Sequence, residues 1–127
     1  MAKSADQKHV LIVEDDKAIA QVLELKLLNA NIAVDKANDG EAAIDMLKTK
    51  KYDLIMTDLI MPKLDGFGLL SKMHEIHADT PKVVMSNLDQ QEDIEKAKGL
   101  GAIEFLPKFE MSLTGIAQYV ENYLEKK

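Results

Sequence analysis

YDLIMTDLIMPKLDG, residues 52–66, is an apolar run that ends in a carboxylate and passes directly into a turn. The run 52–58 reads as a buried strand with Asp58 at its end, and the turn extends from Pro62 to Gly66. A buried charge without a partner is costly. Asp58 therefore either has a structural partner or emerges at a place where chemistry occurs.

Short apolar runs alternate with helical patterns along the rest of the chain. The runs read as strands at 9–14, 31–37, 52–58, 82–86 and 102–106. Apolar residues at helical spacing predict helices at 17–30, around 42–47, and at 64–76, 89–101 and 112–124. Strict alternation predicts an α/β fold, a doubly wound five-stranded parallel sheet with helices on both faces. We expect Asp16, Asp89 and Ser112 to be helix N-caps.

Length and composition favour one compact domain. The 127 residues are 46% apolar, enough for a core. We expect a single domain over 1–127, with a flexible N-terminus at 1–7. The absence of cysteine excludes a disulfide framework and a thiolate metal site. Without a signal peptide or an apolar window of ~20 residues, a cytoplasmic protein with no membrane segment is expected, and the net charge of -6 disfavours nucleic-acid binding.

Polar side chains gather at the carboxyl ends of the predicted strands. They are Glu14 and Asp15 after the first, Asp58 at the end of the third, Ser86 at the end of the fourth and Lys108 after the fifth. Ligands of open parallel sheets bind beyond these ends. Crowded carboxylates need a cation, and oxygen ligands suit Mg²⁺. With a hydroxyl and an ammonium, the set fits phosphoryl transfer, in which a carboxylate can itself be the nucleophile.

Four motifs stand in a specific order and spacing along the chain. They are VLIVEDD at 10–16, DLIMTDLIMPKLDGFGLL at 53–70, KVVMSN at 82–87 and GAIEFLPKF at 101–109. With these motifs the sequence resembles a response-regulator receiver domain (CheY-like) of bacterial two-component signalling, over essentially the whole chain. The resemblance implies a flavodoxin-like (βα)5 fold with strand order 2-1-3-4-5.

The resemblance also implies roles for single residues. Asp58 would be the phosphoacceptor. Glu14, Asp15 and Asp58 would hold Mg²⁺, together with the backbone carbonyl of Ile60. Asp16 follows the acidic pair and is not a ligand position of the family.

Three further residues would respond to the phosphoryl group. The hydroxyl of Ser86 would bond a phosphoryl oxygen, and Lys108 would pair with the phosphate. Phe105 occupies an aromatic switch position whose ring turns inward when Ser86 moves. The partner-binding face would be built from the segments 89–101, 102–106 and 112–124. Its occupant would be a downstream protein or a second copy of the chain.

The function implied is that of a stand-alone receiver with no output domain. It would accept a phosphoryl group from a sensor histidine kinase or a histidine phosphotransfer protein. It would not be an enzyme, beyond its own phosphorylation and slow autodephosphorylation. Two positions that tune the lifetime of the phosphoryl group in the family, Ile60 and Leu88, are apolar here. Because neither can orient an attacking water, we expect the self-dephosphorylation to be slow.

One motif departs from the family pattern. The family usually has a proline after the lysine, with a cis peptide bond between them, whereas here Phe109 follows Lys108 and proline precedes it at Pro107. A cis bond before a residue other than proline costs about 2.5–4 kcal/mol. We therefore predict a trans Lys108–Phe109 bond.

Two other functions compete with the receiver, and one pair of histidines could form a separate metal site. A Mg²⁺-dependent phosphatase with an aspartate nucleophile commonly has a second acid two residues later, where this chain has Ile60. A receiver-like interaction module that works without phosphorylation would not need the complete set of strand-end residues. His74 and His77, three residues apart, could bind a metal, but no third ligand is placed to join them, and solvated side chains explain them better.

Overall fold

In the computed structural model, residues 7–61, 63–76, 79–87, 90–108 and 111–126 are described. The strands are β1 (His9–Val13), β2 (Ala33–Ala37), β3 (Leu54–Thr57), β4 (Lys82–Ser86) and β5 (Ala102–Pro107). The helices are α1 (Lys17–Asn29), α2 (Gly40–Thr49), α3 (Gly66–Ile76), α4 (Gln91–Gly99) and α5 (Leu113–Glu125). Strands and helices alternate as predicted. Among the described residues, none of the helices has the length and apolar character needed to cross a membrane.

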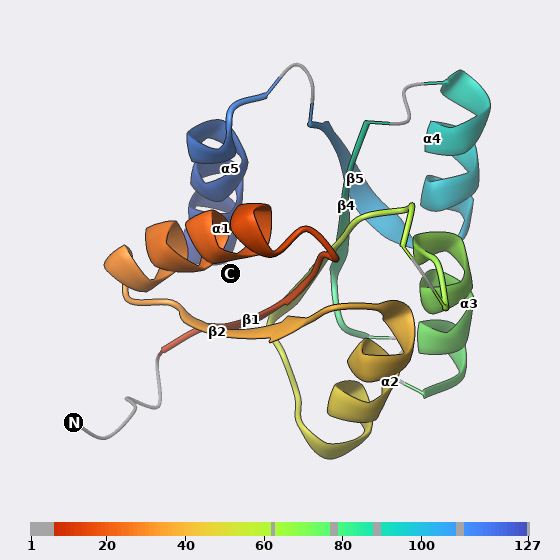
Figure 1. Cartoon of the computed structure of the whole chain (residues 1–127), viewed down its shortest axis with the longest axis horizontal. Helices are drawn as coiled ribbons and strands as arrows, with labels where there is room; N and C mark the ends of the chain where they lie inside the picture. The colour runs from red at the N-terminus through yellow and green to blue at the C-terminus, as the bar shows by residue number, and fades with distance from the viewer. Residues whose placement is uncertain (1–6, 62, 77–78, 88–89, 109–110, 127) are drawn as a thin grey trace.

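All strands pair in parallel, in the order β2-β1-β3-β4-β5, which confirms the predicted topology. The order reverses at β1, because β2 and β3 lie on its two sides. Figure 1 shows α1 and α5 on one side of the sheet and α2, α3 and α4 on the other. The loops that leave β1 and β3 therefore meet at the switch point, where open parallel sheets bind ligands.

Alternate residues of each strand pack into different halves of the core, as the two-residue period of a strand requires. In β1, Val10 and Ile12 join the cluster that α1 and α5 cover, whereas Leu11 and Val13 join the cluster that α2 and α3 cover. All four side chains are fully buried. The near-continuous apolar strands thus reflect a sheet covered on both faces.

A third, smaller cluster lies between the sheet and the helices α3 and α4. Its buried members are Leu59, Leu70, Val84, Ala97, Ala102 and Phe105. Ala97 is the sole buried residue that α4 contributes, whereas each of the other helices contributes at least three. Few apolar contacts therefore attach α4 to the domain.

Two of the three predicted N-caps are confirmed. The Asp16 carboxylate accepts from the N–H groups of Ala18 and Ile19, at 3.0 and 3.1 Å, and Ser112 caps α5. The prediction for α4 was wrong, because the N-cap of that helix is Gln90, which makes no side-chain capping bond. Asp89 itself lies outside the described residues. The predicted N-cap was one residue too early, because a sequence pattern locates the end of a helix only to within one or two residues.

Gly66 brings the start of α3 against the end of β3. A Cβ at this position would collide with the carbonyl oxygen of Asp58 and with the Cα of Leu59. The N–H of Gly66 donates to the carbonyl of Leu59 at 2.9 Å. The turn of the opening motif therefore needs glycine because the backbone passes so close to the residue after the strand.

Candidate phosphoacceptor and metal site

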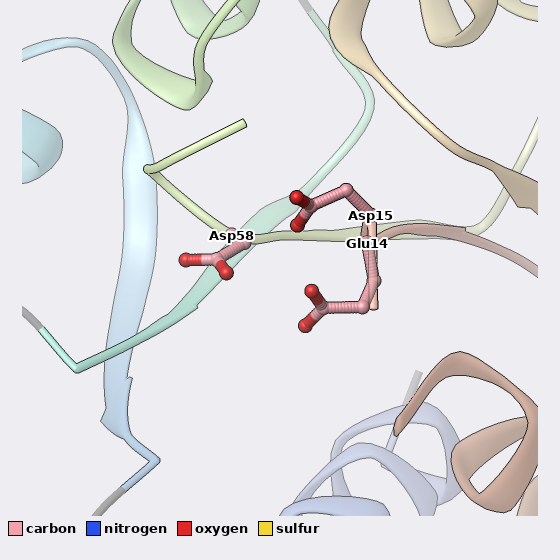
Figure 2. Close-up of side chains that lie close together, drawn as sticks. All are labelled: Glu14, Asp15 and Asp58. Atoms are coloured by element: carbon pink, nitrogen blue, oxygen red, sulfur yellow. The ribbon is translucent and has the colours of Figure 1, made fainter. Parts of the chain in front are cut away.

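Three acidic side chains meet where β1 and β3 end. Val13 and Thr57 are paired in register, so the residues that follow them, Glu14 and Asp58, are neighbours across the two strands. One carboxylate oxygen from each of Glu14, Asp15 and Asp58 lies within 4.8 Å of the others. Figure 2 shows the side chains of Glu14 and Asp15 extending toward that of Asp58. The sheet thus gathers the three acids predicted to hold a metal ion.

The Asp58 carboxylate is held on both of its oxygens. Oδ1 accepts from the backbone N–H of Leu59 at 2.7 Å and, at 3.4 Å, from that of Ile60. Oδ2 accepts from the ammonium of Lys108 at 2.8 Å. Asp58 is 8% exposed. The question raised by its sequence position has an answer: the charge has a partner and also faces a cavity.

Lys108 directly follows β5, and its side chain extends to the acids. Its own N–H donates to the carbonyl of Ser86 at 2.9 Å, which ties the end of β5 to the end of β4. Its Nζ lies 2.8 Å from Asp58 Oδ2 and 2.5 Å from Glu14 Oε1. The predicted lysine therefore lies beside the predicted phosphoacceptor and one predicted metal ligand.

Burial and charge act in opposite directions on these groups. Burial raises the pKa of Glu14 above its ordinary value, and the Lys108 ammonium only partly opposes this. Burial alone would lower the pKa of Lys108, but its contacts with Asp58 and Glu14 outweigh burial and raise it. The ammonium therefore stays charged and stabilises the two carboxylates beside it.

The predicted site residues other than Phe105 surround one open cavity of about 360 Å³. Its lining contains Glu14, Asp15, Asp58, Ile60, Ser86 and Lys108, and also Asp16, Ile19 and Asn87. Ile60 is 62% exposed, whereas Ser86 is 1% exposed. Sequence reasoning gave no role to Ile19, which is the third residue of α1, because helical spacing marks it only as an apolar position.

Residues 10–121 match the family described as the response regulator receiver domain. The chain belongs to this family. As a receiver domain, it is 37% identical over 123 residues to the gliding motility regulatory protein of Myxococcus xanthus, a match that covers 94% of this chain and 16% of that protein. It is 35% identical over 99 residues to the cell cycle response regulator CtrA of Brucella ovis, covering 78% of this chain and 43% of that one. The receiver domain thus spans less than half the length of these relatives.

Solved receiver structures have the same fold. The receiver domain of the Francisella response regulator 1452 superposes with a TM-score of 0.85 at 32% identity, over 94% of this chain and 98% of that one. A two-component response regulator from Clostridium difficile gives 0.86 at 29% identity, with the same coverage. The Mn²⁺-bound form of response regulator Rcp1 gives 0.84 at 25% identity, over 94% and 96% of the two chains.

The acids of this receiver domain have the chemistry of a site for a hard divalent cation. Three carboxylates supply oxygen ligands within a short distance of one another. Glu14 Oε1 is buried and accepts no hydrogen bond from the described residues, although the Lys108 ammonium lies beside it as an ion pair. The three carboxylates face the single positive charge of Lys108, which leaves negative charge for a divalent cation to balance. The residues present therefore fit Mg²⁺.

Phe105, the predicted switch aromatic, lies apart from the cavity. The residue is 8% exposed and packs in the cluster with Leu59, Val84 and Ala97, so it has an inward position in the structure. Ser86 lines the cavity at the end of β4. The two proposed switch residues are thus on neighbouring strands, one in the cavity and one in the core beside α4.

Three predictions depend on residues outside the described part of the chain. They are the lifetime role of Leu88, the trans Lys108–Phe109 bond, and the expectation that His77 is solvated and does not share a metal with His74, which is itself exposed. These stay predictions.

Proposed function

We propose that this receiver domain accepts a phosphoryl group on Asp58 from a phosphohistidine, carried by a sensor histidine kinase or a histidine phosphotransfer protein. The observation that carries the proposal is the position of the Lys108 ammonium, 2.8 Å from the Asp58 carboxylate and beside Glu14. The open cavity holds an ammonium, a buried nucleophilic carboxylate and two further acids. These are the groups that transfer of a phosphoryl group to an aspartate requires.

In the proposed step, a carboxylate oxygen of Asp58 forms a bond to phosphorus as the bond from phosphorus to the donor's imidazole nitrogen breaks. The imidazole leaves with the electron pair and is protonated. The backbone N–H groups that bind Oδ1 fix the carboxylate, which reduces the entropic cost of alignment. The Lys108 ammonium neutralises charge on the phosphoryl oxygens, and the Ser86 hydroxyl bonds one of them.

Mg²⁺ is the proposed cofactor. Glu14, Asp15 and Asp58 would hold it, with the backbone carbonyl of Ile60 as a further ligand. When bound, the ion lowers the repulsion between the carboxylates and the incoming phosphoryl group.

The proposed output is a change of partner affinity and not the turnover of a substrate. The switch would consist of Ser86 and Phe105, and the partner face of α4, β5 and α5. A downstream protein or a second copy of the domain would bind there. The domain would act as a single receiver over 1–127, and its only reactions would be its own phosphorylation and slow autodephosphorylation.

Incubation with Mg²⁺ and a small phosphodonor, followed by intact-mass spectrometry, tests the proposal. One added phosphoryl group is expected, and it should be absent after chelation of Mg²⁺ and in the variant Asp58→Asn. Asp45→Asn, an exposed change on α2, is the matched control and should still be phosphorylated. No added group in the parent would favour a phosphorylation-independent interaction module. Repeated turnover of a phosphomonoester would favour a phosphatase.

A further inference from the structure

The helix α4 has few anchors in the described structure. Ala97 is its sole buried residue, with Ile94 and Leu100 partly buried against the same cluster. The N-cap, Gln90, makes no side-chain hydrogen bond to the helix. The position of α4 is therefore sensitive to any additional contact with its neighbours.

One such contact joins α4 to α3. The Nζ of Lys96 lies 4.3 Å from the ring centroid of Phe67, in the first turn of α3. A cation within ~6 Å of a ring face is attracted to it. Among the described residues Lys96 makes no ion pair within 4.0 Å, so the ring is the partner that the structure gives to its charge.

Phe67 is also close to the phosphoacceptor along the chain. It follows Gly66, whose backbone packs on the carbonyl of Asp58 and donates to that of Leu59. Its ring packs against the cluster that contains Phe105. A contact with this ring therefore connects α4 to the end of β3 by a path that does not pass through Ser86.

The N-terminus of α4 is linked to the site by a second route. Ser86 ends β4, and α4 begins at Gln91, so only four residues separate them. A movement of Ser86 toward a phosphoryl group on Asp58 would pull on the start of the helix. Because the attraction between Lys96 and Phe67 is confined to short distances, a displacement of α4 would weaken it.

We propose that Lys96 is a positioning residue of the switch: its ammonium over Phe67 holds α4 against α3 while Asp58 is an unmodified aspartate. This inference rests on the proposed phosphorylation of Asp58. The contact would oppose the passage to the phosphorylated conformation, because the displacement of α4 inferred above would break it. Its loss makes the domain easier to activate.

Titration with beryllium fluoride in the presence of Mg²⁺, a mimic of the phosphoryl group, tests the inference. Binding is followed through the amide resonances of α4. Lys96→Met keeps most of the side-chain stem and removes the charge, and it should bind the mimic about two- to fivefold more tightly. Lys96→Arg should restore the parent affinity, because a guanidinium also stacks on an aromatic face.

Two further variants complete the design. Lys98→Met removes an exposed charge two positions along the same helix, which does not share the face of Lys96, and should leave the affinity unchanged. Phe67→Leu keeps an apolar side chain but removes the ring, and should act in the same direction as Lys96→Met. Thermal melts of all variants show that each is folded at the temperature of the titration.

Unchanged or weaker binding by both Lys96→Met and Phe67→Leu overturns the inference, as does an equal gain in Lys98→Met, since that would be a general effect of charge. A parent domain that does not bind the mimic overturns the proposed function itself, and this inference with it. If the parent binds the mimic tightly and Lys96→Met has no effect, the inference about Lys96 is wrong and the proposed function stands.

Discussion

The Nζ of Lys108 lies 2.5 Å from Oε1 of Glu14, inside the group of carboxylates that fits a divalent cation. The side chain of Glu14 is 1% exposed and that of Lys108 is 10% exposed, so solvent screens this pair weakly. The ammonium therefore balances the negative charge of the site and, for the same reason, would compete with a metal ion for Glu14.

Lys108→Met should change stability and metal affinity in opposite directions. In metal-free buffer the melting temperature should fall, because Glu14 and Asp58 lose their positive partner. The affinity for Mg²⁺ should rise, because the ion no longer competes with the ammonium. Calorimetric titration and thermal melts with and without Mg²⁺ measure the two effects. Lys98→Met is the control, and an unchanged or lower Mg²⁺ affinity in Lys108→Met would show that the two cations do not compete.

Asp15→Asn should raise the melting temperature in metal-free buffer. Asp15 is exposed and adds a third negative charge beside Glu14 and Asp58. Among the described residues, Lys108 forms ion pairs with Glu14 and Asp58 but not with Asp15. Removing its charge relieves repulsion without breaking an ion pair. Asp58→Asn should give a smaller gain, since it also removes the contact with Lys108. Equal melting temperatures for parent and Asp15→Asn would mean that solvent screens this carboxylate fully.

Gly66→Ala should destabilise the domain by about 1–3 kcal/mol, the range for a forced steric overlap in a packed region. Its Cβ would displace the backbone of Asp58, so phosphorylation by a small donor should slow as well. Gly99→Ala is a matched control, because a Cβ there meets nothing within 4 Å. Urea denaturation and the rate of phosphoryl incorporation measure both effects. Equal stabilities of the two variants would argue that the turn adjusts without strain.

Asp35 should make stability depend on pH. Burial alone would raise its pKa, but the Tyr52 hydroxyl at 2.7 Å and the Lys50 ammonium at 2.9 Å outweigh burial and lower the pKa below its usual value of 3.8. Because the pKa of Asp35 is lower in the folded state than in the unfolded state, its contribution to stability is fully present at pH values above the unfolded-state pKa. The contribution is lost as the pH falls through the folded-state pKa. The stability difference between parent and Asp35→Asn should therefore shrink between neutral pH and pH values below the folded pKa.

Urea melts of both proteins at several pH values measure this difference. Groups that titrate alike in parent and variant cancel in the comparison. If the stability difference between parent and Asp35→Asn stays constant down to the lowest pH measured, the effect of Asp35→Asn comes from lost hydrogen bonding alone.

Ile60→Asn, combined with Leu88→Glu, should speed the loss of the phosphoryl group from Asp58. Ile60 lines the cavity with 62% of its surface exposed, and an amide there can orient an attacking water, which the apolar side chain cannot. Intact-mass spectrometry after removal of the phosphodonor gives the rate. If the parent loses the group as fast as the double variant, the apolar residue does not protect it.

The sequence predicted the topology and the convergence of the strand-end residues, because both follow from alternation and from the geometry of parallel strands. Glu14, Asp58 and Lys108 meet as predicted, although they are far apart in the chain. The contact of Lys108 with Glu14 was not predicted, since a side-chain distance has no signature in a one-dimensional pattern. The contact between Lys96 and Phe67 was missed for the same reason, because it joins two helices whose packing no local pattern determines.

The backbone hydrogen bond from Lys108 to Ser86, 2.9 Å long, couples two strand ends mechanically. Because this bond joins the backbones of the two residues, a shift of one strand end would also move the other, and with it the second side chain. If Asp58 is phosphorylated as proposed, the Ser86 hydroxyl and the Lys108 ammonium would then approach the phosphoryl group together, and slower hydrogen exchange at the amide of Lys108 would report it.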